Sequence, residues 1–161
     1  MSNPKSLISI IFLFAFLLFI KISLAQDLHK ADSLIGKLKT VSHDTDKIKL
    51  LFKIGSIYEN SFSDTALYFY NVAFSEAVKV KNAKYTANSL KHIANVYLDK
   101  CIYNKALEYY FKSLNISIRL NDKSEEALCY NSIGIVYNEM GSFSKSIEYC
   151  MKSLKIMEEI N

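Results

Sequence analysis

Apolar residues recur at helical spacing through most of this chain. One stretch has its apolar positions at Leu90, Ile93, Ala94 and Tyr97, and the next has them at Ala106, Tyr109, Tyr110 and Ser113. Both follow an i, i+3, i+4, i+7 pattern, which places the residues on one face of an α-helix. The pattern therefore predicts two amphipathic helices joined by a short turn.

This pair of helices belongs to a repeat. Three segments align, at 54–73, 93–114 and 133–154, and the second and third match at an offset of 40 residues. The identical pairs at that offset include Ile93/Ile133, Val96/Val136, Tyr97/Tyr137, Lys105/Lys145, Glu108/Glu148, Tyr109/Tyr149, Lys112/Lys152, Ser113/Ser153, Leu114/Leu154 and Ile116/Ile156. The first copy is offset by 39 at Tyr58 and by 40 at Ala66, so its turn is one residue shorter. A period of this size is typical of a stack of helical hairpins.

The joints between helices carry recognisable end signals. Gly141 is suited to the left-handed conformation that ends a helix. Asn121 and Asp122 end one unit, and Asp122 with Glu125 forms a capping box for the next helix. Small residues recur at three sets of equivalent positions, where we expect two helices to cross closely: Gly55/Ala94/Gly134, Ala66/Ala106/Ser146 and Ala73/Ser113/Ser153.

The order of large, apolar and small residues, then Tyr, a turn, and small-x-x-x-aromatic-x-x-small resembles the tetratricopeptide repeat, in a variant with about 40 residues per unit. The resemblance covers roughly residue 48 to the C-terminus. It implies an all-α solenoid, a right-handed superhelix of hairpins that binds proteins or peptides. The chain departs from the family pattern because no Pro ends its units and Cys150 replaces an expected aromatic residue.

The N-terminus has a different character. Lys5 precedes an apolar run from Leu7 to Ile20, and Ser23 and Ala25 then place small residues at the two positions that a signal peptidase reads. This is the pattern of a secretory signal peptide, cut after Ala25. The alternative is an uncleaved anchor at residues 7–24, but a 14-residue run spans only about 21 Å of a hydrocarbon core of about 30 Å. We therefore expect an exported protein on the periplasmic or extracellular side.

These patterns predict the following division: a signal peptide at 1–25, an amphipathic helix and loop at 26–45, and three hairpins at 46–81, 82–121 and 122–161. The N-terminal helix has its apolar face at Ala31, Leu34, Ile35 and Leu38. A leader, a short helix and 40-residue repeats together resemble the extracytoplasmic repeat region of Bacteroidetes-type sensor proteins. The third hairpin has no capping helix after it, so we expect either a partner there or a longer protein.

Composition excludes several function classes. The 18 basic and 16 acidic residues after position 25 give a charge too small and too mixed for nucleic-acid binding. No phosphate-binding Gly loop, HExxH motif or nucleophile elbow is present, so we predict no enzyme, no cofactor and no metal. Of the three cysteines, Cys129 and Cys150 fit helix packing, whereas Cys101 falls in a turn as the more exposed thiol.

The resemblance also implies where a partner would bind. In tetratricopeptide proteins the first helix of each hairpin lines the concave face, and alignment carries this role to Lys49, Phe52, Ser56, Glu59, Asn88, Lys91, Asn95, Asp99, Leu128, Asn131, Ile135 and Asn138. The predicted peptide groove consists of seven of these: Lys49, Phe52, Asn88, Lys91, Asn95, Asn131 and Asn138. Asn amides can hydrogen-bond an extended peptide backbone as both donor and acceptor. Lys91 and Asn95 resemble half of a clamp for a peptide carboxylate, although Leu128 and Ser132 do not complete it.

Two further hypotheses follow from the same sequence. In one, the chain self-associates through Met151, Leu154 and Met157 of the last helix as an adaptor of the cell envelope. In the other, the chain is one part of a larger signalling protein whose output region lies elsewhere. A membrane is involved only through an uncleaved leader or a downstream segment.

Overall fold

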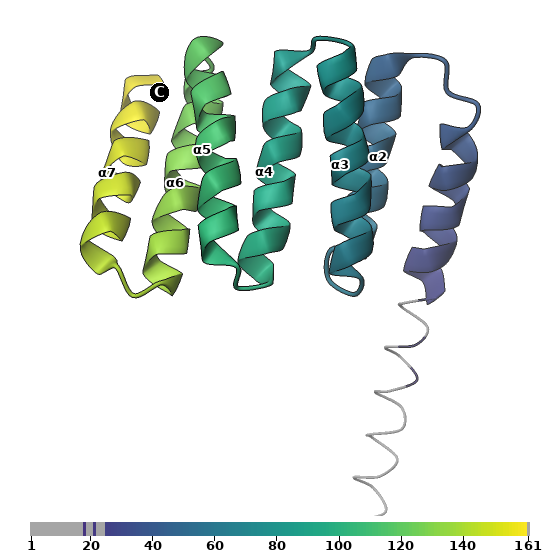
Figure 1. Cartoon of the computed structure of the whole chain (residues 1–161), viewed down its shortest axis with the longest axis horizontal. Helices are drawn as coiled ribbons and strands as arrows, with labels where there is room; N and C mark the ends of the chain where they lie inside the picture. Colours follow the sequence, from purple (N-terminus) through teal and green to yellow (C-terminus); the bar gives the residue numbers. More distant parts are fainter. Residues whose placement is uncertain (1–17, 19–20, 22–24, 161) are drawn as a thin grey trace, which may run out of the picture. The chain divides into compact units, whose positions relative to one another are not determined.

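The computed structural model describes residues 18, 21 and 25–160, and every regular element within them is helical. The ordered helices are α2 (Asp44–Tyr58), α3 (Ser63–Lys79), α4 (Ala83–Asp99), α5 (Tyr103–Arg119), α6 (Lys123–Glu139) and α7 (Phe143–Ile160). They form three successive hairpins, α2–α3, α4–α5 and α6–α7 (Figure 1). The predicted all-α array of helical hairpins is thus confirmed.

The chain divides into two units, Met1–Thr40 and Val41–Asn161. In the first unit, residues 25–38 are helical, and their less exposed face carries the predicted residues Ala31, Leu34, Ile35 and Leu38. The leader itself lies almost entirely outside the described residues. Among the described helices, none is long and apolar enough to cross a membrane.

The segment expected to be a loop up to residue 45 is shorter in the structure, because α2 already begins at Asp44. Asp44 and Asp46 lie in its first turn, where carboxylates are stabilised by the positive end of the helix dipole. These two carboxylates favour a helix that begins two residues earlier than the expected loop boundary.

Each helix of the second unit packs on its neighbours in the chain. One core cluster joins the second hairpin to α6 through Ala94, Tyr110, Cys129, Ile133 and Val136. A second cluster joins α3 to α4 through Ala66, Tyr70, Ile93 and Val96. Every one of these side chains is at most 1% exposed, so the core is divided between the junctions of neighbouring helices.

The small residues lie where the helices come closest. A Cβ added at Gly55 would lie 2.5 Å from the ring of Tyr70, and one at Gly134 would lie 2.7 Å from Sγ of Cys150. The predicted close crossings are therefore present at these two positions. Ser113 adds a hydrogen bond to the carbonyl of Ala87, and the equivalent Ser153 donates to Ala127.

Several of the identical pairs build one arrangement twice. Tyr97 stacks on Tyr109 with ring centroids 5.5 Å apart, and the Lys105 ammonium lies 5.1 Å from the Tyr97 ring centroid. The third hairpin repeats this with Tyr137, Tyr149 and Lys145 at 5.4 and 5.1 Å. Aromatic stacking with a cation over the ring holds the two helices of a hairpin together near their turn.

Most turns share one helix-ending geometry. Lys81, Cys101, Asn121 and Gly141 all have a positive φ, between 53° and 70°. The residue after each donates its N–H to a carbonyl five residues earlier, as Asn82 does to Ala77, which defines a Schellman motif. The predicted roles of Gly141 and Asn121 are confirmed, while Lys81 and Cys101 adopt this conformation without a glycine.

The turn between α2 and α3 has a different geometry, as expected from a turn that is one residue shorter than the others. No residue between α2 and α3 has a positive φ, and Phe62 donates its N–H to the carbonyl of Tyr58 instead. The predicted capping box is half formed, since the Asp122 side chain accepts from the Glu125 N–H. The Glu125 carboxylate does not complete it, because it accepts a hydrogen bond from Lys91.

We predict that Gly55→Ala lowers the free energy of unfolding by about 1–3 kcal/mol, because the added methyl group must displace the buried Tyr70 ring. The matched control is Gly36→Ala, where nothing lies within 4 Å of the added Cβ. This control should raise helix stability by about 0.5–1 kcal/mol. Urea unfolding followed by circular dichroism measures both, and equal effects would contradict the crossing described here.

Candidate functional site

The seven predicted groove residues lie on the first helices. Lys49 and Phe52 are on α2, Asn88, Lys91 and Asn95 on α4, and Asn131 and Asn138 on α6. Their surroundings divide them into two groups, because some already have partners inside the chain and others do not.

Phe52 is part of an aromatic cluster at the junction of α2, α3 and α4. Its ring centroid lies 5.1 Å from that of His92, 6.3 Å from that of Tyr70 and 6.2 Å from that of Tyr85. Lys49 beside it is exposed and pairs with Asp46 at 3.1 Å, which is the main cause of a raised pKa of its ammonium. The ring of Phe52 is therefore engaged in packing between helices and offers little free surface to a ligand.

Lys91 and Asn95 are also occupied. The Lys91 ammonium lies 2.5 Å from the Glu125 carboxylate and links α4 to α6. The Tyr110 hydroxyl donates to the side-chain oxygen of Asn95 at 2.5 Å, and burial raises the pKa of that hydroxyl to about 12. A half-clamp for a peptide carboxylate would have to break both interactions.

Three asparagines complete the predicted set. Asn131 and Asn138 are exposed on α6, and Asn88 is half-buried on α4. None of their side-chain amides has a hydrogen-bond partner among the described residues. An amide without an internal partner can donate and accept at the same time, which suits a peptide backbone.

Polar groups meet beneath this face, at the junction of the first two hairpins. Tyr70 donates its hydroxyl to Glu59 at 2.5 Å, and the His92 ring stacks on the Tyr70 ring at 4.7 Å. Nδ1 of His92 lies 3.8 Å from the Glu59 carboxylate, within ion-pair range but longer than a hydrogen bond. His92 is the main cause of a lowered pKa of Glu59, burial opposes it, and Tyr70 lowers it further.

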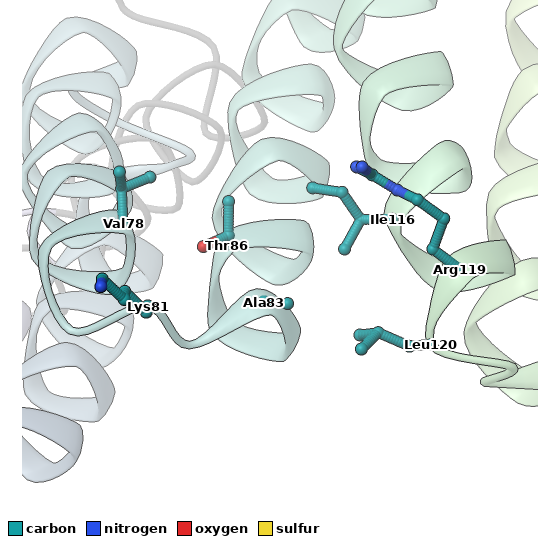
Figure 2. A pocket seen from close by; sticks show the side chains of 7 residues that line it. All are labelled: Val78, Lys81, Ala83, Thr86, Ile116, Arg119 and Leu120. Atoms are coloured by element: carbon teal, nitrogen blue, oxygen red, sulfur yellow. The ribbon is translucent and has the colours of Figure 1, made fainter.

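A second surface was not found from the sequence. It is a groove of about 420 Å³ lined by Val78, Lys81, Ala83, Thr86, Ile116, Arg119 and Leu120. Figure 2 shows Val78 and Lys81 on one side, Ile116, Arg119 and Leu120 on the other, and Ala83 and Thr86 between them. A neighbouring hollow shares Thr86, Ile116 and Arg119 and extends the groove along α5 to Lys112 and Tyr109. We call this combined hollow the α3–α5 groove.

The α3–α5 groove opens on the opposite side of α4 from the predicted site. Thr86 and Asn95 are nine residues apart, which at 3.6 residues per turn is two and a half turns. The sequence signal for this groove is the presence of apolar residues at the ends of helices, where a polar residue is more usual. In the structure two of them, Val78 and Leu120, are 49% and 45% exposed.

A third surface is the outer face of α7. Phe143, Ile147, Met151 and Leu154 are between 51% and 65% exposed. Of the equivalent residues of α5, Leu114 belongs to the core cluster that includes α6, and Tyr103, Leu107 and Phe111 pack against that cluster. The face that α6 covers on α5 is thus exposed on α7 within the described residues.

The remaining chemistry is sparse. All three cysteines are free, with Cys101 exposed, Cys129 buried and Cys150 intermediate, as predicted for Cys101 and Cys129. Burial raises the pKa of the Cys129 thiol, which suits a packing role. No group of three or more potential metal-ligating side chains is found in the described part of the chain.

Comparison with known protein families gives a match over part of the repeat region. Residues 85–159 match the sequence profile of the tetratricopeptide repeat family. A search of the curated proteins gives no significant match.

Solved structures share the fold. The apo form of RapI superposes with a TM-score of 0.74 at 24% identity, over 88% of this chain and 40% of that one. The tetratricopeptide domain of Arabidopsis FLU gives 0.66 at 19% identity, over 73% of this chain and 99% of that one. A Rap protein complexed with Competence and Sporulation Factor gives 0.73 at 18% identity, over 88% and 41%. The chain thus spans less than half the length of either Rap protein, and these likenesses concern the fold alone.

We predict that part of the stability is lost in acid through Glu59. Because the folded-state pKa of Glu59 lies below its ordinary value of 4.5, its contribution is present above that pH and is lost as the pH falls through the folded-state pKa. Asp99 acts in the opposite direction, since burial and then the charge of Glu59 raise its pKa. Glu59→Gln should therefore flatten the fall in unfolding free energy between pH 7 and about pH 3.

Urea unfolding at several pH values measures this slope. The matched control is Glu158→Gln, on an exposed carboxylate of α7, which should leave the slope as in the wild type. A steeper acid loss in Glu59→Gln than in the wild type would contradict the assigned sign.

Proposed function

Since the chain contains tetratricopeptide repeats over residues 85–159, we propose that it is a non-enzymatic module that binds a peptide or protein segment. The proposed site is the face formed by the first helices α2, α4 and α6, on the concave side of a right-handed superhelix. The observation that carries this proposal is the set of unpartnered amides at Asn88, Asn131 and Asn138. Polar side chains without internal partners on a rigid helical surface are free to hydrogen-bond an incoming backbone.

Lys49 and Phe52 extend the proposed site onto α2. Lys49 pairs with Asp46, but both side chains are more than half exposed, so its ammonium can exchange Asp46 for a carboxylate of the ligand. Phe52 packs beside it in the aromatic cluster and supports this position. Lys91 and Asn95 contribute mainly by holding α4 against α6 and α5, since their polar groups are already paired. The proposed ligand contacts are therefore the lysine and the three free asparagines.

We further propose that the protein is exported and acts as the sensory repeat region of a larger signalling protein. The support for export is the charged, apolar and small-residue order of residues 5–25. The support for ligand capture by such repeats is that a Rap protein of similar fold is found complexed with Competence and Sporulation Factor. The alternative membrane anchor at residues 7–24 would place the repeats on the same side of the membrane.

A second candidate function is self-association. The exposed row of Phe143, Ile147, Met151 and Leu154 on α7 favours it, because the same face of α5 is covered by a helix. Exposed apolar surfaces of this kind mark interaction sites in soluble proteins.

We predict that a photoreactive amino acid at Asn131 or Asn138, introduced in the producing cells, gives one discrete crosslinked product of the same partner mass. The matched control position is Ser144, which is also exposed but lies on α7. Equal crosslinking at 131, 138 and 144 would contradict the first-helix site. A photoreactive group at Met151 tests the second candidate, because self-association yields a product of twice the chain mass.

We predict that the mature protein begins at Gln26 and is recovered outside the cytoplasm. Intact-mass measurement after cell fractionation shows whether residues 1–25 are absent. Ala25→Arg places a large charged side chain at the cleavage position and should leave the leader attached and the protein in the membrane fraction. A full-length wild-type chain in the cytoplasmic fraction would contradict export.

A further inference from the structure

The α3–α5 groove combines an apolar floor with unpaired positive charge. Ile116, Leu120 and Val78 provide apolar surface, while Lys81 and Arg119 lie on opposite sides of it (Figure 2). Lys81 makes no ion pair with any described residue, and the side chain of Arg119 has one hydrogen bond within the described residues, from its Nε to the Asn115 carbonyl at 3.3 Å. No acidic residue is among those that line the groove or its extension.

The next pair of hairpins shows that this charge is specific to the α3–α5 groove. At the offset of 40, Lys81 corresponds to Asn121, Arg119 to Glu159 and Thr86 to Glu126. Glu126 is only 7% exposed and pairs with Lys123 at 2.9 Å. The pKa of Lys123 is raised first by Glu126, with Glu159 adding to the shift. The equivalent position of the third hairpin thus supplies its own acids.

We propose that the α3–α5 groove is a second binding site, which takes an acidic segment of a partner protein that also carries apolar side chains. Carboxylates of the segment pair with Lys81 and Arg119, and its apolar side chains cover Ile116 and Leu120. Charge complementarity selects this occupant, because the groove and its extension are lined by Lys81, Lys112 and Arg119 and by no acid, and only Lys112 already has an acidic partner, Glu108. The equivalent positions 40 residues later carry both signs, since Glu126 and Glu159 lie there beside Lys123.

The backbone at this site is already fixed. Lys81 occupies the left-handed position of the Schellman motif between α3 and α4, with its N–H donated to the Val78 carbonyl at 3.0 Å. Arg119 is the last residue of α5, where the negative end of the helix dipole also favours a cation. Preformed positions of this kind reduce the conformational entropy lost on binding.

The probe is a fluorescein-labelled synthetic peptide of glutamates with two leucines. Two counterparts isolate the recognised features, one with lysine in place of each glutamate and one with serine in place of each leucine. We expect the acidic, leucine-containing peptide to bind at least about tenfold more tightly than either counterpart, with affinity falling as salt is raised. Equal binding of all three peptides would overturn the proposal.

The test variant is Lys81→Asn with Arg119→Glu, which introduces the residues found 40 positions later, Asn121 and Glu159, so the fold has a precedent for both. The control is Lys53→Asn with Lys155→Glu, which makes the same change in net charge at exposed positions away from the groove. We expect about a tenfold loss of peptide affinity in the first variant and less than about a twofold loss in the second. Equal losses would show a general charge effect and overturn the assigned site.

Two further results separate this proposal from its alternatives. The Asn131→Ala variant should bind the acidic peptide as the wild type does, so that the first-helix site and the α3–α5 groove can fail independently. Anionic phosphatidylserine vesicles are the competing class of ligand. Stronger capture by such vesicles than by the peptide, lost in Lys81→Asn with Arg119→Glu, would overturn the peptide assignment in favour of a lipid surface.

Discussion

The close approach of neighbouring helices at a few small residues governs the structure. At Gly55 and Gly134 even one methyl group would overlap a side chain of the facing helix. Because the backbones approach so closely at Gly55, the large side chain of Tyr70 opposite it is fully buried between the helices. Each layer is one helix thick, so no residue is far from a surface. A molecule built in this way has two usable faces and little interior in which to place a catalytic centre.

The turns transmit this spacing from one hairpin to the next. Lys81, Cys101, Asn121 and Gly141 occupy one backbone conformation, although only one of them is glycine. For the other three residues the left-handed conformation costs free energy, of the order of 1 kcal/mol each. The paired Schellman hydrogen bonds and the apolar packing on both sides offset that cost. As follows from this backbone conformation, the side chain of Lys81 is exposed to solvent and lies at the edge of the α3–α5 groove.

Sequence periodicity was sufficient for the helices, their pairing and most of their turns, because all three depend on local spacing. It was not sufficient for the site. Lys91 and Asn95 have the correct spacing for a free polar pair, yet Glu125 and Tyr110 come from other helices to occupy them. Such partners depend on how α4 lies against α5 and α6, which spacing along α4 does not record. The α3–α5 groove was missed for the same reason, because its walls come from helices separated by about 40 positions.

Differences between equivalent positions carry more information about binding than the identities do. Tyr97/Tyr137, Tyr109/Tyr149 and Lys105/Lys145 are alike because they build the same stack with the same cation over it. Thr86 on α4 and Glu126 on α6 occupy equivalent positions. Both helices are continuous at these positions, so the difference between the two residues is not required for folding. The buried carboxylate of Glu126 requires Lys123, whereas Thr86 requires no charge and leaves Arg119 without an acid. Repetition therefore accounts for the scaffold, and the departures from it place an internal ion pair at Glu126 and leave the cations of the α3–α5 groove available to a partner.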